Sequence, residues 1–146
     1  MFTAKRYSVF FVSLLGGVVY FAIKLFFLNN SFTFNINKFY YYIIIVPVLE
    51  EWIFRGNIQR ILKDKLAKKD KVHGALIFST TDSFISVQNV ITSALFASMH
   101  LFYSSASHAL MVFIPSLIFG LVYDRHKKLI FPAFLHGFYN LGVFII

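Results

Sequence analysis

The sequence predicts an all-α membrane protein, a polytopic bundle of about five transmembrane helices with a cytoplasmic N-terminus. Three observations lead to this fold class. Hydrophobic residues make up 58% of the 146 residues and charged residues only 14%, whereas a soluble domain is nearer half apolar and a quarter charged. Several apolar runs are long enough to span a bilayer as helices. Short basic segments separate these runs, as cytoplasmic loops do in membrane proteins.

The first apolar run covers residues 7–28 and contains a single charge, Lys24. At ~1.5 Å per residue it is long enough to cross a hydrocarbon core of ~30 Å, so it predicts the first span. The polar stretch NNSFTFNINK follows as a short loop. A second span is predicted from about Phe39, where tyrosines form an aromatic interface belt, toward Arg60.

The second half of the chain predicts three further spans. The segment RILKDKLAKKDKVH is the most charged of the chain, and GALIFSTTDSFISVQ after it is interpreted as an interfacial helix or loop. The third span is predicted from about Asn89 to Phe102, with an upstream extension to about Phe84. SSAS forms a tight turn into the fourth span, about His108 to Tyr123. The basic segment DRHKK leads to the fifth span, LIFPAFLHGFYNLGVFII.

The basic residues provide a test of this five-span interpretation, because cytoplasmic loops carry an excess of lysine and arginine. Eleven basic residues fall on one side of the bilayer, and only Lys38 lies in a loop on the other side. The N-terminus is therefore predicted to be cytoplasmic and the C-terminus to lie outside. The eleven residues are Lys5, Arg6, Arg60, Lys63, Lys65, Lys68, Lys69, Lys71, Arg125, Lys127 and Lys128.

Composition also limits the partners and the chemistry. No internal repeat or linker divides the chain, so residues 1–146 are predicted to form one integral-membrane domain. The chain has no cysteine, which excludes disulfides, thiolate metal sites and a cysteine nucleophile. The net charge of +8 would suggest nucleic acid in a soluble protein, but the basic loops account for it here. The expected partner is the lipid bilayer and not nucleic acid.

Four groups of ionisable or polar residues lie within the predicted spans, where an ionisable side chain costs on the order of 3 kcal/mol. On a helix, Glu51 and Arg55 are four residues apart and share a face, which predicts an ion pair. Glu50 points about 100° away and is left without a local counter-ion. It is therefore free to act as a general base. The four groups are Glu50 with Glu51 and Arg55, His100, His108, and His136 with Asn140.

The histidines and the asparagine complete a set of hydrolytic groups. His136 and Asn140 are four residues apart, and both can donate hydrogen bonds to an oxyanion. Phe96 and His100 repeat this spacing on the third span. A carboxylate can take a proton from water while the polar donors hold the negative charge on the scissile carbonyl oxygen. These residues together indicate water-mediated hydrolysis of an amide.

The same residues occur in three motifs, LEEWIFRG, LFASMHLF and LHGFYN. In this order they resemble the motifs of the CPBP family of intramembrane proteases, which includes CAAX-type prenyl-protein proteases and bacteriocin-processing relatives. The family motifs are a glutamate pair with an arginine, a phenylalanine with a histidine, and a histidine with an asparagine, and all are intact. The resemblance covers about residues 45–146, and the motif-bearing core is placed at about 39–146.

The resemblance implies an intramembrane endopeptidase of the glutamate type. Glu50 would be the catalytic glutamate, and His100 its partner in activating water. His136 and Asn140 would form the oxyanion site. The substrate would be a membrane-associated protein or peptide, and a prokaryotic inner or plasma membrane is the expected location. The supporting residues of the motifs are Glu51, Arg55 and Phe96.

The sequence leaves the cofactor and the functional class open. The CPBP family has been described as metal-dependent, and two histidines with a carboxylate would suit zinc. A metal-free reaction without a cofactor is preferred, because a glutamate base needs no ion and asparagine is a poor zinc ligand. Two alternatives are a non-catalytic immunity or assembly protein, whose polar residues serve helix packing, and a transporter with a carboxylate–histidine proton relay.

Three geometric expectations depend on the tertiary structure. Straight helices would place His136 about 10 Å from the cytoplasmic side and His100 much nearer the outside. The two would not meet unless the third span is tilted or shifted, with SSAS dipping into the membrane, or the span boundaries differ from those predicted. Pro47, one turn before the glutamates, is expected to kink its helix and free a carbonyl. Gly120 and Gly137 are expected to allow close approach of helices.

Overall fold

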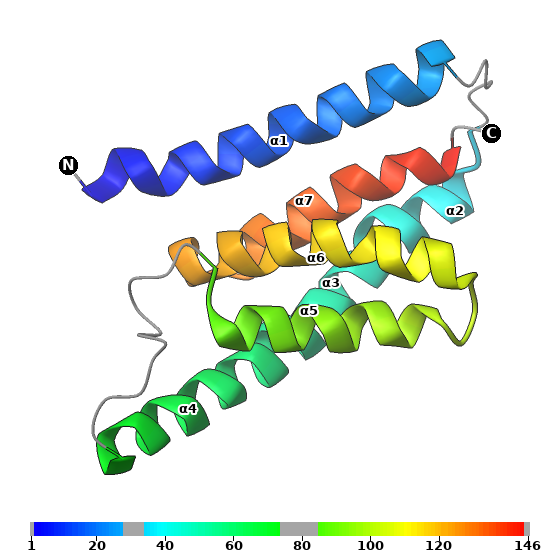
Figure 1. Cartoon of the computed structure of the whole chain (residues 1–146). Coiled ribbons are helices and arrows are strands. Elements are labelled where there is room, and N and C mark those ends of the chain that lie inside the picture. The colour runs from blue at the N-terminus through cyan, green and yellow to red at the C-terminus, as the bar shows by residue number, and fades with distance from the viewer. Residues whose placement is uncertain (1, 28–33, 74–84, 145–146) are drawn as a thin grey trace.

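The structure is a computed structural model that describes residues 2–27, 34–73 and 85–144, and the regular elements in these ranges are all helical (Figure 1). The all-α prediction is confirmed for this part of the chain. The elements are α1 (Phe2–Phe27), α2 (Ile36–Phe39), η1 (Tyr40–Ile45), α3 (Val46–Glu51), η2 (Trp52–Gln59), α4 (Arg60–His73), α5 (Val87–His100), α6 (Ala106–His126), α7 (Ile130–Asn140) and η3 (Leu141–Phe144).

Within the described ranges, two helices have the length and hydropathy of a membrane span. They are Tyr7–Phe26 within α1 and Ala106–His126, which is α6. They coincide with the predicted first and fourth spans. In contrast, α5 has 14 residues and α7 has 11, so at ~1.5 Å per residue they are shorter than a hydrocarbon core of ~30 Å. The described helices therefore support a membrane protein, while five complete spans stay a prediction.

The predicted second span is part of a longer helical run that extends from Ile36 to His73. The helix does not end near Arg60, as the boundary predicted, but continues through the charged segment. No glycine or proline occurs between Asn57 and His73, and lysine, leucine and alanine there are strong helix formers. Of the segment GALIFSTTDSFISVQ, residues 74–84 lie outside the described residues. The chain resumes at Ile85, and Ser86 caps α5.

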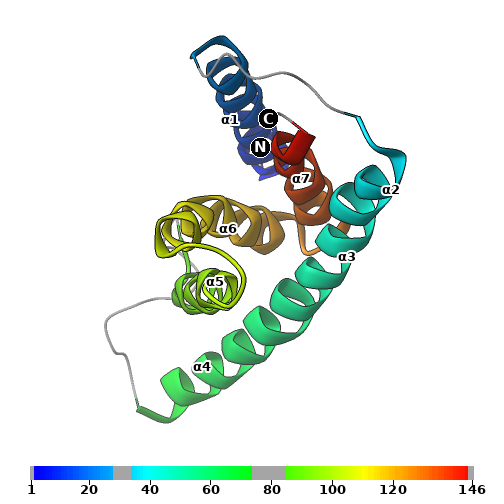
Figure 2. The same ribbon diagram turned by 90° about the vertical axis from the view of Figure 1, so that its right-hand side faces the viewer.

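The central helices are α5, α6 and α7. In Figures 1 and 2, α5 and α6 lie side by side, and α7 lies on the other side of α6. The helical run from α2 to α4 curves around this group, so that η1 and α3 pack on α7 while η2 packs on α5. This arrangement brings the three predicted motifs, on α3–η2, α5 and α7, to one region of the bundle.

The hydrophobic core lies between α6 and α7, with α1 covering it. Phe119 and Val122 of α6 pack against Leu135 of α7, and all three side chains are buried. From α1, the partly buried Val9, Phe10 and Leu14 close the cluster.

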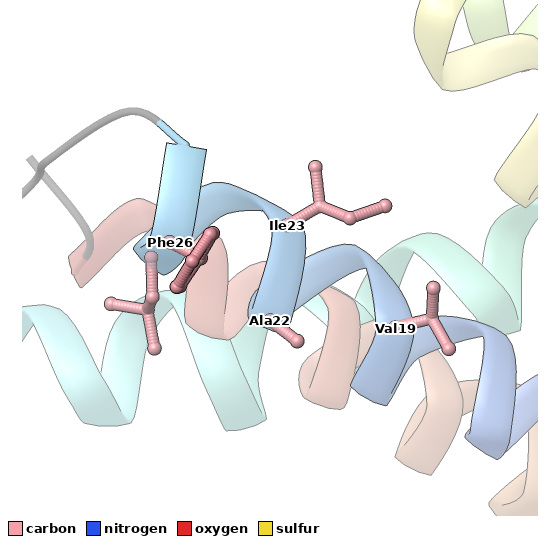
Figure 3. Close-up of a pocket in the computed structure, with 5 residues that line it drawn as sticks. Val19, Ala22, Ile23 and Phe26 are labelled. Carbon is pink, nitrogen blue, oxygen red and sulfur yellow. The ribbon is translucent and has the colours of Figure 1, made fainter.

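Helix α1 contacts the bundle with one side only. Its close approach to α7 requires a glycine, because a Cβ at Gly17 would lie 2.6 Å from a ring carbon of Phe138. The Tyr139 hydroxyl donates to the Ser13 carbonyl at 3.0 Å. The other side carries exposed apolar side chains, and near its end they line a shallow pocket (Figure 3). An apolar surface of this extent is what a lipid-facing helix presents.

Candidate active site

The two adjacent glutamates at the end of α3 lie in different surroundings. The Glu51 side chain is fully buried, whereas 25% of the Glu50 side chain is exposed. Glu51 Oε2 accepts a hydrogen bond from Arg55 Nε at 3.1 Å, so the ion pair predicted from the four-residue spacing is present. The pair leaves Glu50 as the carboxylate that water can reach.

Arg55 is fully buried, and residues of α3, η2, α5 and α6 accept the hydrogen bonds of its guanidinium group. Its Nη1 donates to Gln59 Oε1 at 3.2 Å and to Ser93 Oγ at 3.4 Å. Its Nη2 donates to the carbonyl and the hydroxyl of Ser116 at 2.9 and 2.6 Å. A buried cation is costly unless it is paired and fully hydrogen-bonded, and both conditions are met here. Arg55 therefore joins the glutamate-bearing helix to α5 and α6.

Behind Arg55 a polar network continues between α5 and α6. Asn89 Nδ2 donates to the Leu117 carbonyl at 2.9 Å, and Ser93 Oγ donates to Asn89 Oδ1 at 3.1 Å. A Cβ at Gly120 would overlap the Asn89 side chain. The expected close approach at Gly120 is therefore present, and it makes room for an amide.

His136 of α7 lies between the two carboxylates. Its Nδ1 is 3.0 Å from Glu51 Oε1, and its Nε2 is 3.5 Å from Glu50 Oε2. The imidazole stacks on Phe119, with ring centroids 5.0 Å apart and an angle of 17° between the planes. These contacts hold the ring in one orientation. The predicted oxyanion donor is thus a direct neighbour of both glutamates.

His100, the last residue of α5, joins the same cluster through Phe96. The Phe96 ring centroid is 4.8 Å from that of His100 and 5.7 Å from that of His136. Both histidine rings therefore pack against the same aromatic ring. The expected difference in depth does not separate them, because His100 lies one helical turn after Phe96 and His136 packs against the same ring.

The orientation of His100 is set by its own helix. Its Nδ1 is 2.9 Å from the Phe96 carbonyl oxygen. A carbonyl oxygen only accepts, so Nδ1 carries the proton and Nε2 is left for water or substrate. This is the atom that a partner of Glu50 would use to hold a water molecule.

Asn140 takes a position that the motif spacing does not reveal. Its Nδ2 donates to the Tyr42 carbonyl at 2.9 Å. In the π-helical segment η1, the Val46 N–H bonds to the carbonyl five residues earlier. The next donor in that pattern would come from Pro47, which has no N–H. The Asn140 amide supplies this missing donor, and this bond uses only one of the two amide hydrogens.

The close approach of α7 to η1 depends on Gly137. A Cβ at this position would overlap the Ile43 carbonyl oxygen. Pro47 and Gly137 therefore act at the same contact between η1 and α7. Pro47 leaves the Tyr42 carbonyl without a backbone donor, and Gly137 lets α7 come close to η1.

Several residues of the site were not predicted. Gln59 lies four residues after Arg55, so helical spacing is the signal that could have identified it. Tyr103, whose ring centroid lies 5.1 Å from that of His100, was also not predicted. His108, one of the four groups identified in the sequence, has its ring centroid 6.2 Å from that of His100. Ser93 and Ser116 carried no signal, because isolated serines in apolar helices are common and their partner comes from another element.

The donor set does not fit a zinc site. Among the described residues, no three histidine, cysteine, aspartate or glutamate side chains form a group that could hold a metal ion. Both nitrogens of His136 face carboxylates, and Nδ1 of His100 is bound to a backbone carbonyl. Zinc would need free lone pairs from several of these groups at once.

Apolar helices converge on a partly exposed glutamate and two histidines, which is a set of groups that a membrane-integral hydrolase would use. A comparison with protein families agrees with this class. The family model of the Rce1-like type II CAAX prenyl endopeptidases matches residues 31–142. The chain belongs to this family and is therefore a CAAX-type membrane protease, which confirms the predicted resemblance. Neither a search of curated proteins nor a search of solved structures finds a match.

Proposed function

We propose that the chain is an intramembrane endopeptidase that cleaves a membrane-associated protein or peptide with a water molecule activated by Glu50. The observation that carries this proposal is the unequal placement of the adjacent carboxylates. Glu51 is enclosed by Arg55 and His136, whereas part of the Glu50 side chain is exposed. A general base must come within hydrogen-bond reach of the water that it deprotonates, and only Glu50 meets this condition.

The proposed reaction assigns one task to each polar group. Glu50 takes a proton from water, and Nε2 of His100 orients the same water molecule. The resulting hydroxide attacks the scissile carbonyl carbon, and the negative charge on its oxygen is held by His136 and Asn140. Glu50 then passes its proton to the leaving amine as the C–N bond breaks. Glu51 and Arg55 keep His136 and the helices in position.

The substrate to test first follows from the family. Its description is a CAAX prenyl endopeptidase, and C-a-a-X denotes a C-terminal sequence whose cysteine is prenylated. A quenched fluorescent peptide with this ending, with and without the prenyl group, would be assayed with the protein in bilayers. If the protein instead cleaved an unprenylated precursor peptide or a sorting tail, its substrate would belong to one of the other classes that such proteases cleave.

The decisive variants separate the two glutamates. We expect Glu50→Gln to abolish cleavage while the melting temperature stays near that of the wild type, because its carboxylate is partly exposed and makes no short hydrogen bond. Glu51→Gln and Arg55→Ala should lower the free energy of unfolding by about 3–5 kcal/mol, since each leaves a buried charge without its partner.

Activity assays and thermal unfolding in the same detergent measure both effects. If Glu50→Gln and Glu51→Gln lost equal stability and the wild type cleaved none of the peptides, the polar cluster would serve packing. The non-catalytic alternative would then replace this proposal.

A further inference from the structure

A second site is indicated by a pocket of about 550 Å³ between η2, the start of α4 and the connection from α6 to α7. None of the motif residues Glu50, Glu51, His100 and His136 lines it. Trp52 lines this pocket and is 56% exposed, whereas the preceding residue, Glu51, is buried in the candidate active site. The pocket thus lies on a different side of the helix from the buried Glu51.

The lining combines cations with interfacial aromatics. Arg60, Lys127 and Lys128 contribute positive charge from two segments that are far apart in the sequence. Trp52 and Tyr123 contribute the aromatic side chains that are typical of the membrane–water interface. Leucine and isoleucine from the start of α7 add an apolar wall. A surface with cations above an apolar wall matches the junction of a phospholipid headgroup and its chains.

The charges in this pocket are only partly balanced. Lys127 Nζ lies 3.2 Å from Asp124 Oδ1, and Asp124 also accepts a hydrogen bond from Ser86 at 2.6 Å. Asp64 is the other acid close enough to affect the Tyr123 phenol. Arg60 and Lys128 are exposed and form no ion pair within the described part of the chain. The pocket therefore retains positive charge for an anion.

The position of Lys127 is set by the backbone. It ends α6 in the left-handed region with a φ of 56°, and its N–H bonds to the Tyr123 carbonyl at 2.8 Å. Its ammonium lies 5.9 Å from the centroid of the Tyr123 ring. Partial burial lowers the pKa of Lys127, although half of its side chain is exposed.

We infer that this pocket binds the headgroup of an anionic phospholipid at the cytoplasmic surface of the membrane. All three of its cations belong to the basic segments that the five-span topology places on the cytoplasmic side, and the cytoplasmic leaflet carries anionic lipids. Basic pockets between helices on that side are a known form of lipid-headgroup site. The inference is independent of the proposed hydrolysis, because it involves none of the groups assigned to the reaction.

The chain provides its own probe, since Trp52 is its only tryptophan and lines the pocket. The experiment measures quenching of Trp52 fluorescence in bilayers that contain brominated phosphatidylglycerol or brominated phosphatidylcholine at the same mole fraction. We expect stronger quenching by phosphatidylglycerol. Each pocket cation removed should lower the relative binding constant about fivefold, so that the double variant Arg60→Gln, Lys128→Gln loses the preference.

Two further variants make this result specific. Lys65→Gln with Arg125→Gln removes the same charge from exposed positions outside the pocket, and it should keep the preference. Arg60→Lys with Lys128→Arg keeps both charges and should also keep it. Equal quenching by the two lipids in the wild type would overturn the inference. An equal loss in both neutralising double variants would also overturn it, because the attraction would then belong to the whole surface.

A last measurement separates a lipid from a free anion. Inorganic phosphate is added to the protein in pure phosphatidylcholine bilayers, and chloride at the same ionic strength is the control. We expect no difference in Trp52 emission between them. A phosphate-specific change without any lipid preference would assign the pocket to a soluble anion and overturn the lipid assignment.

Discussion

At the scale of single residues, two identical side chains next to each other acquire different properties from their contacts. Glu51 turns toward Arg55 and His136 and is removed from water, while Glu50 is paired, within the described part of the chain, with His136 at 3.5 Å. A single step along a helix turns the side chain by about 100°, which is enough to place one carboxylate in the core and the other at its edge. The position of Arg55 four residues later decides which of them is enclosed.

Asn140 tests the oxyanion assignment at this scale. We expect Asn140→Ala to lower kcat about 10²–10³-fold, because one donor to the developing negative charge is lost. Initial rates at saturating substrate measure this effect, and Glu50→Ala in the same assay should be silent. If Asn140→Ala kept the wild-type rate, the Asn140 amide would have no role in the reaction and would serve only the hydrogen bond to the Tyr42 carbonyl.

The chemistry at Glu50 also predicts the response to metal chelation. Glu50 and His100 supply a base and an acceptor for water without an ion, so we expect cleavage to continue in a strong chelator. Metal analysis of the purified protein should find well below one equivalent of zinc. Loss of activity with chelator, and its return with added Zn²⁺, would replace the glutamate mechanism while keeping the protease.

At the scale of elements, the glutamate-bearing helix lacks one backbone hydrogen bond, and a side chain from another helix replaces it. The π-helical segment η1 leads to Pro47, and the backbone carbonyl that proline leaves without a donor is bound by Asn140 from α7. Gly137 allows this approach, because any Cβ would overlap the carbonyl of Ile43. The proline therefore helps to position the last motif against the first.

This account predicts an energetic coupling between Pro47 and Asn140. Pro47→Ala restores an N–H that can bond to the Tyr42 carbonyl, so Asn140→Ala should then cost about 1 kcal/mol less stability than it does in the wild type. A double-mutant cycle by chemical or thermal unfolding measures the difference. As a control, the stability effects of Pro115→Ala in α6 and Asn140→Ala should add. If the effects of Pro47→Ala and Asn140→Ala also added, Asn140 would not be replacing the donor that Pro47 lacks.

At the scale of the whole molecule, the bundle gathers basic segments at one end. Arg60, at the start of α4, and Lys127 and Lys128, after α6, line the same pocket, although 67 positions separate Arg60 from Lys127 in the numbering of the chain. The five-span topology requires these segments to share the cytoplasmic side. The helix α1, which the family match does not include, covers the core of α6 and α7.

The topology can be measured directly, because the chain has no cysteine of its own. Single cysteines at positions 68 and 127 should react with a membrane-impermeant reagent only from the cytoplasmic side. A cysteine at position 30 should react only from outside. Sealed vesicles of both orientations provide the measurement, and labelling of position 68 from outside would disprove the five-span arrangement.

The sequence was sufficient for the properties that depend on local spacing. Hydropathy identified α1 and α6 as candidate membrane spans, and the four-residue intervals identified the ion pair of Glu51 with Arg55. Motif order identified the family. All of these are properties of one helix or of the order of helices, so they can be read without knowing how the helices pack.

Only the tertiary structure decided which helices meet. His136 lies between the glutamates across 85 positions, and Asn140 reaches Tyr42 across 98. Straight, full-length spans would have kept His100 and His136 at different depths, whereas in the structure both rings pack against Phe96. Such contacts depend on helix length, crossing and close approach, and these result from packing the whole bundle rather than from any local pattern.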